Sequence, residues 1–286
     1  MNKLPVGKTI SSAYAFTFSQ LGSIIGLAWI SLVAIGILQF LPYAAGAATV
    51  AANPLQEGQR AIQNMGISIL VLLLSAIVYV AVTRLALGQK PGGAIAHFAL
   101  GVAEFRTFGA IFLLGLAIVG ISIGLAIVIA VIGGTLGASH NQAVLALTIL
   151  VLAIAVICAV AYIGARLGFV LVPATVVEEH ISLSRGWTLT QGNFWRIVAV
   201  LLAVTIPIFL VECIAVAVVM GPDLLTLIPA GPHGDPQALS AHMEEIIGRH
   251  APVLIGLRLV FAPFQFGLGI GASAFGYRTL TAAAPQ

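Results

Sequence analysis

The chain has 286 residues, of which 60% are apolar and only 7% are charged. Its mean hydropathy of +1.12 excludes an ordinary soluble domain, for which about 25% charged residues would be usual. The net charge of +3 requires no nucleic-acid partner, because basic residues in short cytoplasmic loops and the anionic lipid beside them account for it.

Six stretches are long enough to cross a membrane as helices. A hydrocarbon core of about 30 Å takes roughly 20 apolar helical residues, and these stretches are continuously apolar, whereas the strands of a membrane barrel alternate. In chain order they cover residues 21–41, 65–82, 108–132, 143–165, 197–220 and 251–277. The predicted fold class is all-α: one polytopic membrane domain over 1–286, with six transmembrane helices arranged as three hairpins.

A half-polar stretch precedes each odd-numbered span, and two of these stretches match. Residues 10–20 align with residues 181–191, and 94–105 occupies the same place midway with a weaker match. We interpret each stretch as an interfacial amphipathic helix that leads into a hairpin, because aromatic side chains are favoured at the headgroup level. A chance match in an apolar sequence of low diversity is the alternative.

The distribution of basic residues predicts the orientation. Nine of the twelve Lys and Arg fall on the side of the termini: Lys3, Lys8, Arg84, Lys90, Arg106, Arg166, Arg185, Arg196 and Arg278. The opposite connections contain only Arg60 and Arg249. Because cytoplasmic loops carry the excess of Lys and Arg, we expect a multi-pass protein of the bacterial inner (plasma) membrane, with both termini in the cytoplasm.

The connection over 221–250 is the only long one on the outer side. Its second half predicts a short surface helix, with Asp235 as N-cap and Pro236 in the first helical position. Residue types that ligate metals occur there: His233, Asp235, His242, Glu245 and His250. Polar residues are expected on the solvent-facing side of such a helix in any case, so we predict no metal site.

Glu212 and Arg258 are the two charges inside predicted spans. Ionisable residues there are costly and usually face a partner or a water-filled cavity. Counted from the outer ends of spans five and six, both lie roughly 11 to 12 Å deep, with Pro207 and Pro263 each five residues further in. We hypothesise a hairpin kinked at both prolines and held by an ion pair. The alternatives are an arginine that reaches outward to the surface, and a polar cavity for a headgroup or a proton.

Gly120, Ser122 and Gly124 match the G-x-S-x-G pattern of hydrolase nucleophiles. That pattern needs a strand-to-helix turn, whereas here it lies inside an apolar helix, and all six His lie outside the spans. We therefore predict that the protein is not an enzyme, and no nucleotide, metal or redox motif implies a cofactor. The glycine spacing favours close helix packing instead. The same spacing recurs at Gly22 and Gly26 and at Gly267 and Gly271.

Polar and aromatic residues cluster between the fourth and fifth spans, at Arg166, Phe169, Pro173, Ala174, Glu178, Ser184, Trp187, Gln191, Asn193, Trp195 and Arg196. This segment resembles the membrane-domain family attached to some bacterial glycerophosphoryl diester phosphodiesterases, and the related YciC-type inner-membrane proteins. In those phosphodiesterases a separate soluble barrel carries catalysis, so the resemblance carries no catalytic residues across. The resemblance implies a function related to the cell envelope or to lipids. We interpret five residues as cytoplasmic interfacial anchors: Trp187, Gln191, Asn193, Trp195 and Arg196.

The sequence thus predicts a non-enzymatic inner-membrane protein that binds membrane lipids or a membrane-protein partner. The alternative is a transporter or flippase for a small solute or a lipid, with a polar site near Glu212 and Arg258. Few polar groups in the spans could line such a pathway. Faces of small residues permit self-association without requiring it, which leaves the oligomeric state open.

Overall fold

A computed structural model describes residues 3–44, 54–89, 100–137, 142–181, 183–221, 223–226 and 236–282. Its helices are α1 (Val6–Ser19), α2 (Leu21–Ala44), α3 (Pro54–Ala86), α4 (Val102–Gly137), α5 (Gln142–Ile163), the π-helical turn η1 (Gly164–Gly168), α6 (Phe169–Glu178), α7 (Leu183–Leu189), α8 (Phe194–Met220), α9 (Asp223–Thr226) and α10 (Pro236–Thr281). No strand occurs within these described ranges. Six helical segments are long and apolar enough to cross a membrane, which confirms the all-α, polytopic prediction.

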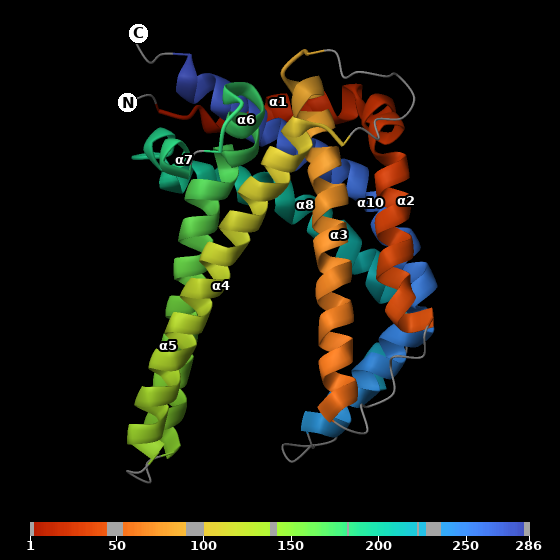
Figure 1. The fold of residues 1–286 in the computed structure, drawn as a ribbon, viewed down its shortest axis with the longest axis vertical. Coiled ribbons are helices and arrows are strands. Elements are labelled where there is room, and N and C mark those ends of the chain that lie inside the picture. The colour runs from red at the N-terminus through yellow and green to blue at the C-terminus, as the bar shows by residue number, and fades with distance from the viewer. Residues whose placement is uncertain are drawn as a thin grey trace.

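The helices form a bundle in which both ends of the chain lie on the same side (Figure 1). α1 lies across that end, at a steep angle to α2, which then descends through the bundle. α4 and α5 form a hairpin that diverges from α2 and α3 in the same view. Half of the predicted interfacial stretch 94–105 lies outside the described residues, and its counterpart before α8 contains the short helix α7.

Several helices extend beyond their predicted bounds, among them α3, α4 and the helices of the fourth and sixth spans. The fourth span continues from α5 through η1 and α6, giving an apolar segment over Leu150–Glu178, because Arg166 is buried there instead of ending the helix. The predicted surface helix after Pro236 is the first part of α10 and is continuous with the sixth span. In Figure 1 this first part, in light blue, runs obliquely before the helix turns toward the termini.

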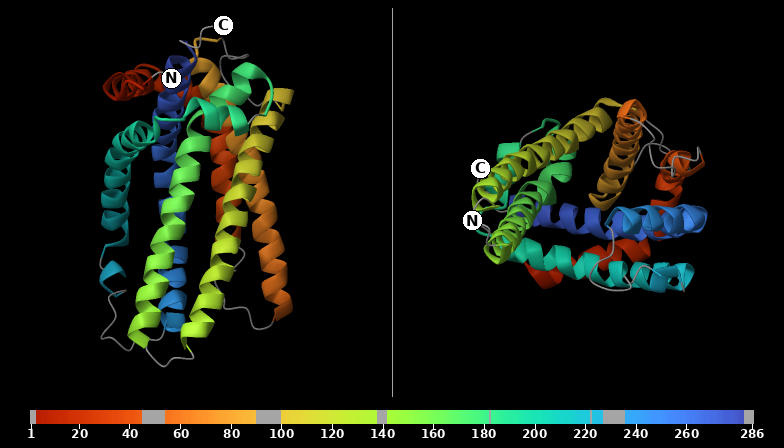
Figure 2. Two further views of the ribbon diagram at one scale, coloured as in Figure 1. Left: turned by 90° about the vertical axis from the view of Figure 1, so that its left-hand side faces the viewer. Right: turned by 90° about the horizontal axis from the view of Figure 1, so that it is seen from below.

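α10 is the helix around which the others assemble. It contacts α1, α2, α3, α6 and α8, and seen from below it lies between α8 and α3 (Figure 2). Three of its glycines allow close approach of a neighbour. A methyl group built on Gly267 would lie 2.7 Å from Thr17, one on Gly271 would lie 3.0 Å from Phe16, and one on Gly276 would lie 2.5 Å from Phe169.

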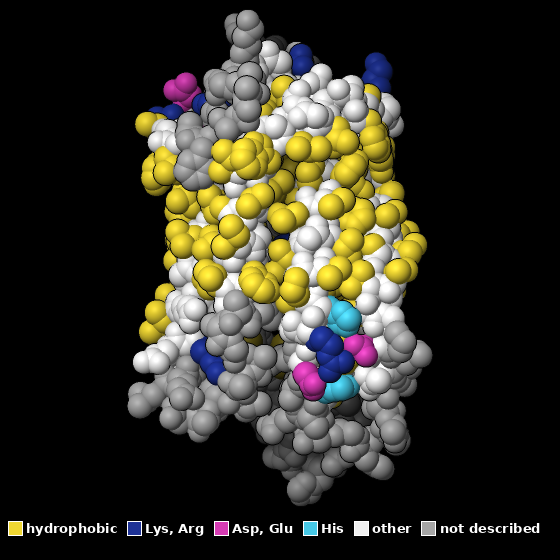
Figure 3. All heavy atoms as spheres, turned by 90° about the vertical axis from the view of Figure 1, so that its right-hand side faces the viewer, with side chains coloured by type: hydrophobic (Ala, Val, Ile, Leu, Met, Phe, Trp, Pro, Cys, Tyr) yellow, Lys and Arg dark blue, Asp and Glu magenta, His cyan; other side chains and the backbone are white. Residues whose placement is uncertain are grey.

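The predicted packing through Gly267 and Gly271 is therefore present against α1. The other two glycine pairs differ, because a methyl group at Gly22, Gly26, Gly120 or Gly124 would meet nothing within 4 Å. On the face that Figure 3 shows, apolar side chains form a band across the bundle, and charged side chains gather beyond it near the end opposite the termini. This distribution is the one expected of a protein that spans a bilayer.

Gly276→Ala is expected to destabilise the protein, because the added methyl group would collide with the Phe169 ring. Overpacking of this kind costs about 1–3 kcal/mol. Gly256→Ala is the matched control in the same helix, where a methyl group meets nothing within 4 Å, and it should leave stability unchanged or slightly higher. The midpoint of thermal unfolding in detergent measures both. Equal midpoints for the two variants would contradict the close approach.

Candidate functional site

Glu212 has a different partner from the one the sequence predicts. Its carboxylate, half-buried on α8, accepts a 2.7 Å hydrogen bond from the Nε2 of Gln265 on α10. Arg258 lies seven residues before Gln265, which is about 10 Å nearer the outer end of α10. The sequence placed Glu212 and Arg258 at equal depths because the depth of Arg258 was counted from residue 251 as the outer end of span six. In the structure, α10 begins earlier, at Pro236.

Arg258 makes no ion pair or hydrogen bond with any residue in the described part of the chain. Its exposed side chain lines a cavity of about 480 Å³ between α2, α3 and α10. Three further polar residues line the same cavity: Gln39, Asn64 and Ser68. A cation inside a spanning segment thus shares its cavity with neutral hydrogen-bonding groups and with apolar side chains such as Ile67 and Ile255.

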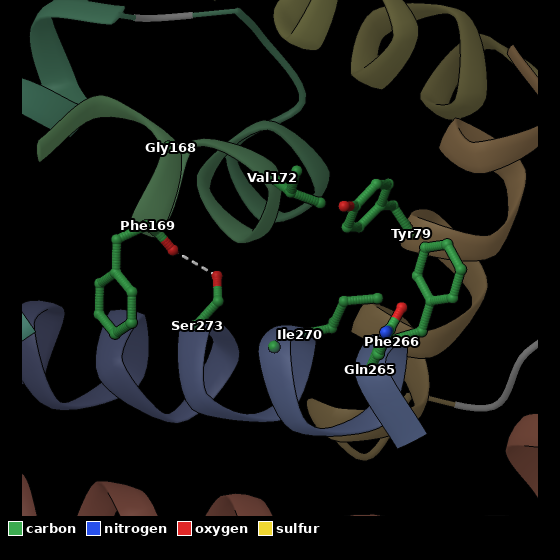
Figure 4. A pocket seen from close by; sticks show the side chains of 9 residues that line it. Tyr79, Gly168, Phe169, Val172, Gln265, Phe266, Ile270 and Ser273 are labelled. Atoms are coloured by element: carbon green, nitrogen blue, oxygen red, sulfur yellow. Dashed lines mark hydrogen bonds between the residues drawn. The ribbon is translucent and has the colours of Figure 1, made fainter. Parts of the chain in front are cut away.

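Two more cavities continue along the contact between α3 and α10. One of about 110 Å³ shares Gln39 and Arg258 with the first and adds Ser75 and Gln265. The next, of about 270 Å³, shares Gln265 and Phe266 with that one and is also lined by Tyr79 and Ser273. We call these three cavities the α3–α10 seam. Figure 4 shows its inner part, where the Tyr79 hydroxyl from α3 points toward Val172 of α6.

The polar residues of the seam occupy one face of each helix. On α3 they recur at intervals of four, seven and four residues, at Asn64, Ser68, Ser75 and Tyr79, and on α10 they are Arg258, Gln265 and Ser273. Such intervals keep side chains on one side of a helix. Sequence reasoning missed this face because most of its members are single neutral residues in apolar runs. The spacing of the polar residues along α3 was the feature of the sequence that could have indicated this face.

Two of the prolines in the spans leave backbone carbonyls that other helices satisfy. Pro207 lies inside α8 and cannot donate to the carbonyl of Ala203, which instead accepts a 3.0 Å hydrogen bond from the Tyr14 hydroxyl of α1. In the same way, Pro173 frees the carbonyl of Phe169, and the Ser273 hydroxyl donates to it (Figure 4). Pro263 lies within the continuous helix α10.

Three of the five predicted anchors hold the structure together near the termini. Asn193, 3% exposed, accepts a 2.9 Å hydrogen bond from the backbone N–H of Leu4, and Arg196 donates to the Leu4 carbonyl. The ring of Trp187 lies 3.7 Å from the guanidinium carbon of Arg166. The other two, Gln191 and Trp195, are exposed, and Trp195 is 78% exposed.

Arg166 and Glu178 tie the fourth span to its neighbours. Arg166 donates to the Tyr162 hydroxyl and to the Trp187 carbonyl, each at 2.9 Å. Glu178 accepts 3.0 Å hydrogen bonds from Arg185 and from the Tyr277 hydroxyl of α10. The segment on which the family resemblance rests therefore mainly links α6, α7 and α10 through hydrogen bonds.

The charged group at the opposite end consists of Asp223, His242, Glu245, Arg249 and His250 (Figure 3). His250 and Asp223 lie 2.9 Å apart, and this hydrogen bond, together with the charge of Arg249, holds the pKa of Asp223 below its usual value. The contact thus stabilises the fold above the ordinary aspartate pKa and is lost as the pH falls through the lowered one. Within the described ranges no group has the geometry of a metal site; His233 and Asp235 lie outside them.

Ser122, the residue at the centre of the G-x-S-x-G pattern, donates a 2.9 Å hydrogen bond to the carbonyl of Ile118 one turn earlier. This is the ordinary interaction of a serine within a helix. No base contacts this hydroxyl among the residues that the structure describes.

Comparison with known proteins gives no further guide: no family model, no characterised protein and no solved structure matches the chain. The resemblance to the phosphodiesterase membrane domains stays a prediction.

Tyr14→Phe is expected to lower the free energy of unfolding by about 1 kcal/mol, because it leaves the Ala203 carbonyl unpaired. In a Pro207→Ala background the same change should cost close to nothing, since the alanine supplies the backbone N–H that bonds this carbonyl within α8. The free energies of unfolding of the wild type, both single variants and the double variant complete this double-mutant cycle. An equal cost in both backgrounds would show that the Tyr14 hydroxyl does not serve this carbonyl.

Proposed function

We propose that this protein is a non-enzymatic integral membrane protein of the bacterial inner membrane that binds lipid and has an accessory role in the envelope. One observation carries the proposal: three cavities that share lining residues run along α3 and α10 inside the spanning part of the bundle. Their lining is mainly apolar with a few polar groups. Such a lining suits a ligand that has apolar chains and a polar head.

The position of the termini supports the proposed orientation. Both lie at the same end of the bundle (Figure 1), and nine of the twelve basic residues fall on that side of the spans in the sequence. By the positive-inside rule this end is the cytoplasmic one. The exposed Trp195 near the start of α8 suits the headgroup layer, where tryptophan is favoured.

Native mass spectrometry of the protein extracted with its surrounding lipids is expected to detect a retained lipid. Ser75→Phe should reduce that retention, because the larger side chain fills the cavity at the narrowest part of the seam. Cys158→Phe, an equal enlargement of an exposed position on α5, is the control and should retain as much lipid as the wild type. If the wild type retains no lipid, the proposed function is wrong.

Transport of the same class of ligand is the second candidate. It is favoured by the extent of the seam, whose polar residues run from Arg258 to Ser273, and by the Glu212–Gln265 hydrogen bond at its side. Discontinuous or proline-containing helices beside a polar site are also a common transporter device.

A binding role predicts that proteoliposomes translocate fluorescently labelled phospholipid no faster than protein-free vesicles. The measurement is the fraction of label that an impermeant reductant reaches with time. A rate that depends on the protein and falls in Gln265→Leu, but not in the exposed α5 variant Ile157→Ala, would favour a flippase over a passive binding protein.

A further inference from the structure

We propose that Arg258 is the anion-binding end of the α3–α10 seam and holds the acidic headgroup of a lipid from the leaflet opposite the termini. This inference rests on the proposed lipid-binding function and specifies its ligand class. It assigns to Arg258 a ligand in place of the ion pair with Glu212.

The lack of a countercharge supports an anionic ligand at Arg258. Arg258 lies within the spanning segment Glu245–Thr281, where a cation is costly unless it meets a partner. In the described part of the chain it forms no ion pair, and Glu212 is engaged by Gln265 about 10 Å further along α10. An anion from outside the chain completes the charge balance.

The chemistry of the cavity lining also favours an acidic headgroup. A guanidinium group offers paired N–H donors that match the oxygens of a phosphate or a carboxylate. Gln39, Asn64 and Ser68 line the same cavity and bring additional neutral donors from α2 and α3. Neutral donors beside a single cation suit an acidic headgroup of low charge, because they add hydrogen bonds without adding charge.

The apolar part of the lining favours a lipid over a free anion. The cavity at Arg258 is also lined by Ile67, Ile247, Leu254 and Ile255, and the next cavity inward by Leu32, Ile35 and Val71. A hydrated inorganic anion gains nothing from such contacts. A lipid whose headgroup is at Arg258 can place part of an acyl chain along them, at about 0.8 kcal/mol for each buried CH₂.

Arg249 provides a matched control at the same end of the molecule. It lies nine residues before Arg258 on α10, and its charge is already paired with Glu245 at 3.1 Å and with Asp223 at 3.5 Å. It does not line any of the seam cavities. Arg249→Gln therefore removes the same charge without altering the proposed site.

The experiment is native mass spectrometry of the full chain after reconstitution in bilayers of equal parts phosphatidylglycerol and phosphatidylcholine. The wild type is expected to retain phosphatidylglycerol preferentially. Arg258→Gln should weaken that retention about 10- to 100-fold, the effect of losing a hydrogen bond to a charged group. Arg258→Lys, which keeps the charge but lacks the paired donors, should weaken the preference less than Arg258→Gln does, and Arg249→Gln should leave it unchanged. Addition of glycerol 3-phosphate at millimolar concentration should not displace the lipid.

The outcomes separate the two proposals. Retention of both lipids without preference, unchanged in Arg258→Gln, would overturn the role of Arg258 and leave lipid binding intact. Loss of the preference in Arg249→Gln as well would also overturn it, because a general surface charge would then be responsible. Displacement by glycerol 3-phosphate would identify the ligand as a free anion. Absence of any retained lipid in the wild type would remove the proposed function itself.

Ser68→Phe, which fills the cavity but keeps the charge, should reduce lipid retention. Unchanged retention in this variant would place the lipid elsewhere.

Discussion

The close approach of α1 to α10 is the constraint on which the rest of the structure depends. Because Gly267 and Gly271 present no side chain, α1 lies directly against α10 through Phe16 and Thr17, across the end of the bundle that holds both termini. Lipid provides no hydrophobic force between helices, so dense packing of this kind has to supply the association. α1 thereby orients α2, and α10 in turn contacts α2, α3, α6 and α8.

Hydrogen bonds between helices complete this arrangement. In a bilayer no water can pair with a backbone carbonyl, so a proline within a span creates an acceptor that a donor from another helix can satisfy. Tyr14 satisfies the carbonyl released by Pro207, and Ser273 the one released by Pro173. Both donors come from the two helices that pack most closely, α1 and α10. The prolines thus act as sites of attachment between helices.

The sequence predicted the six spans because long apolar runs and sorted basic residues are direct consequences of the bilayer. It did not predict the continuation of the fourth span past Arg166. A charge normally ends a span, whereas here Arg166 is held by the hydroxyl of Tyr162 and by the ring and carbonyl of the distant Trp187. Glu212 and Arg258 were recognised as the residues that need an explanation, but their partners depend on where α10 begins and how it is inclined. The seam was not predicted because Ser68, Ser75 and Gln265 form a shared lining only when α3 and α10 face each other, and the sequence does not show which helices pack together.

The proposed lipid lies along the α3–α10 seam with its acidic headgroup at Arg258. A structure of the protein determined by electron cryomicroscopy in nanodiscs that contain phosphatidylglycerol tests this placement most directly. Elongated density is expected along the seam, with its headgroup end within hydrogen-bonding distance of the guanidinium group. A seam closed by side-chain contacts, or an Arg258 that forms an ion pair with Glu212 in the bilayer, would contradict it.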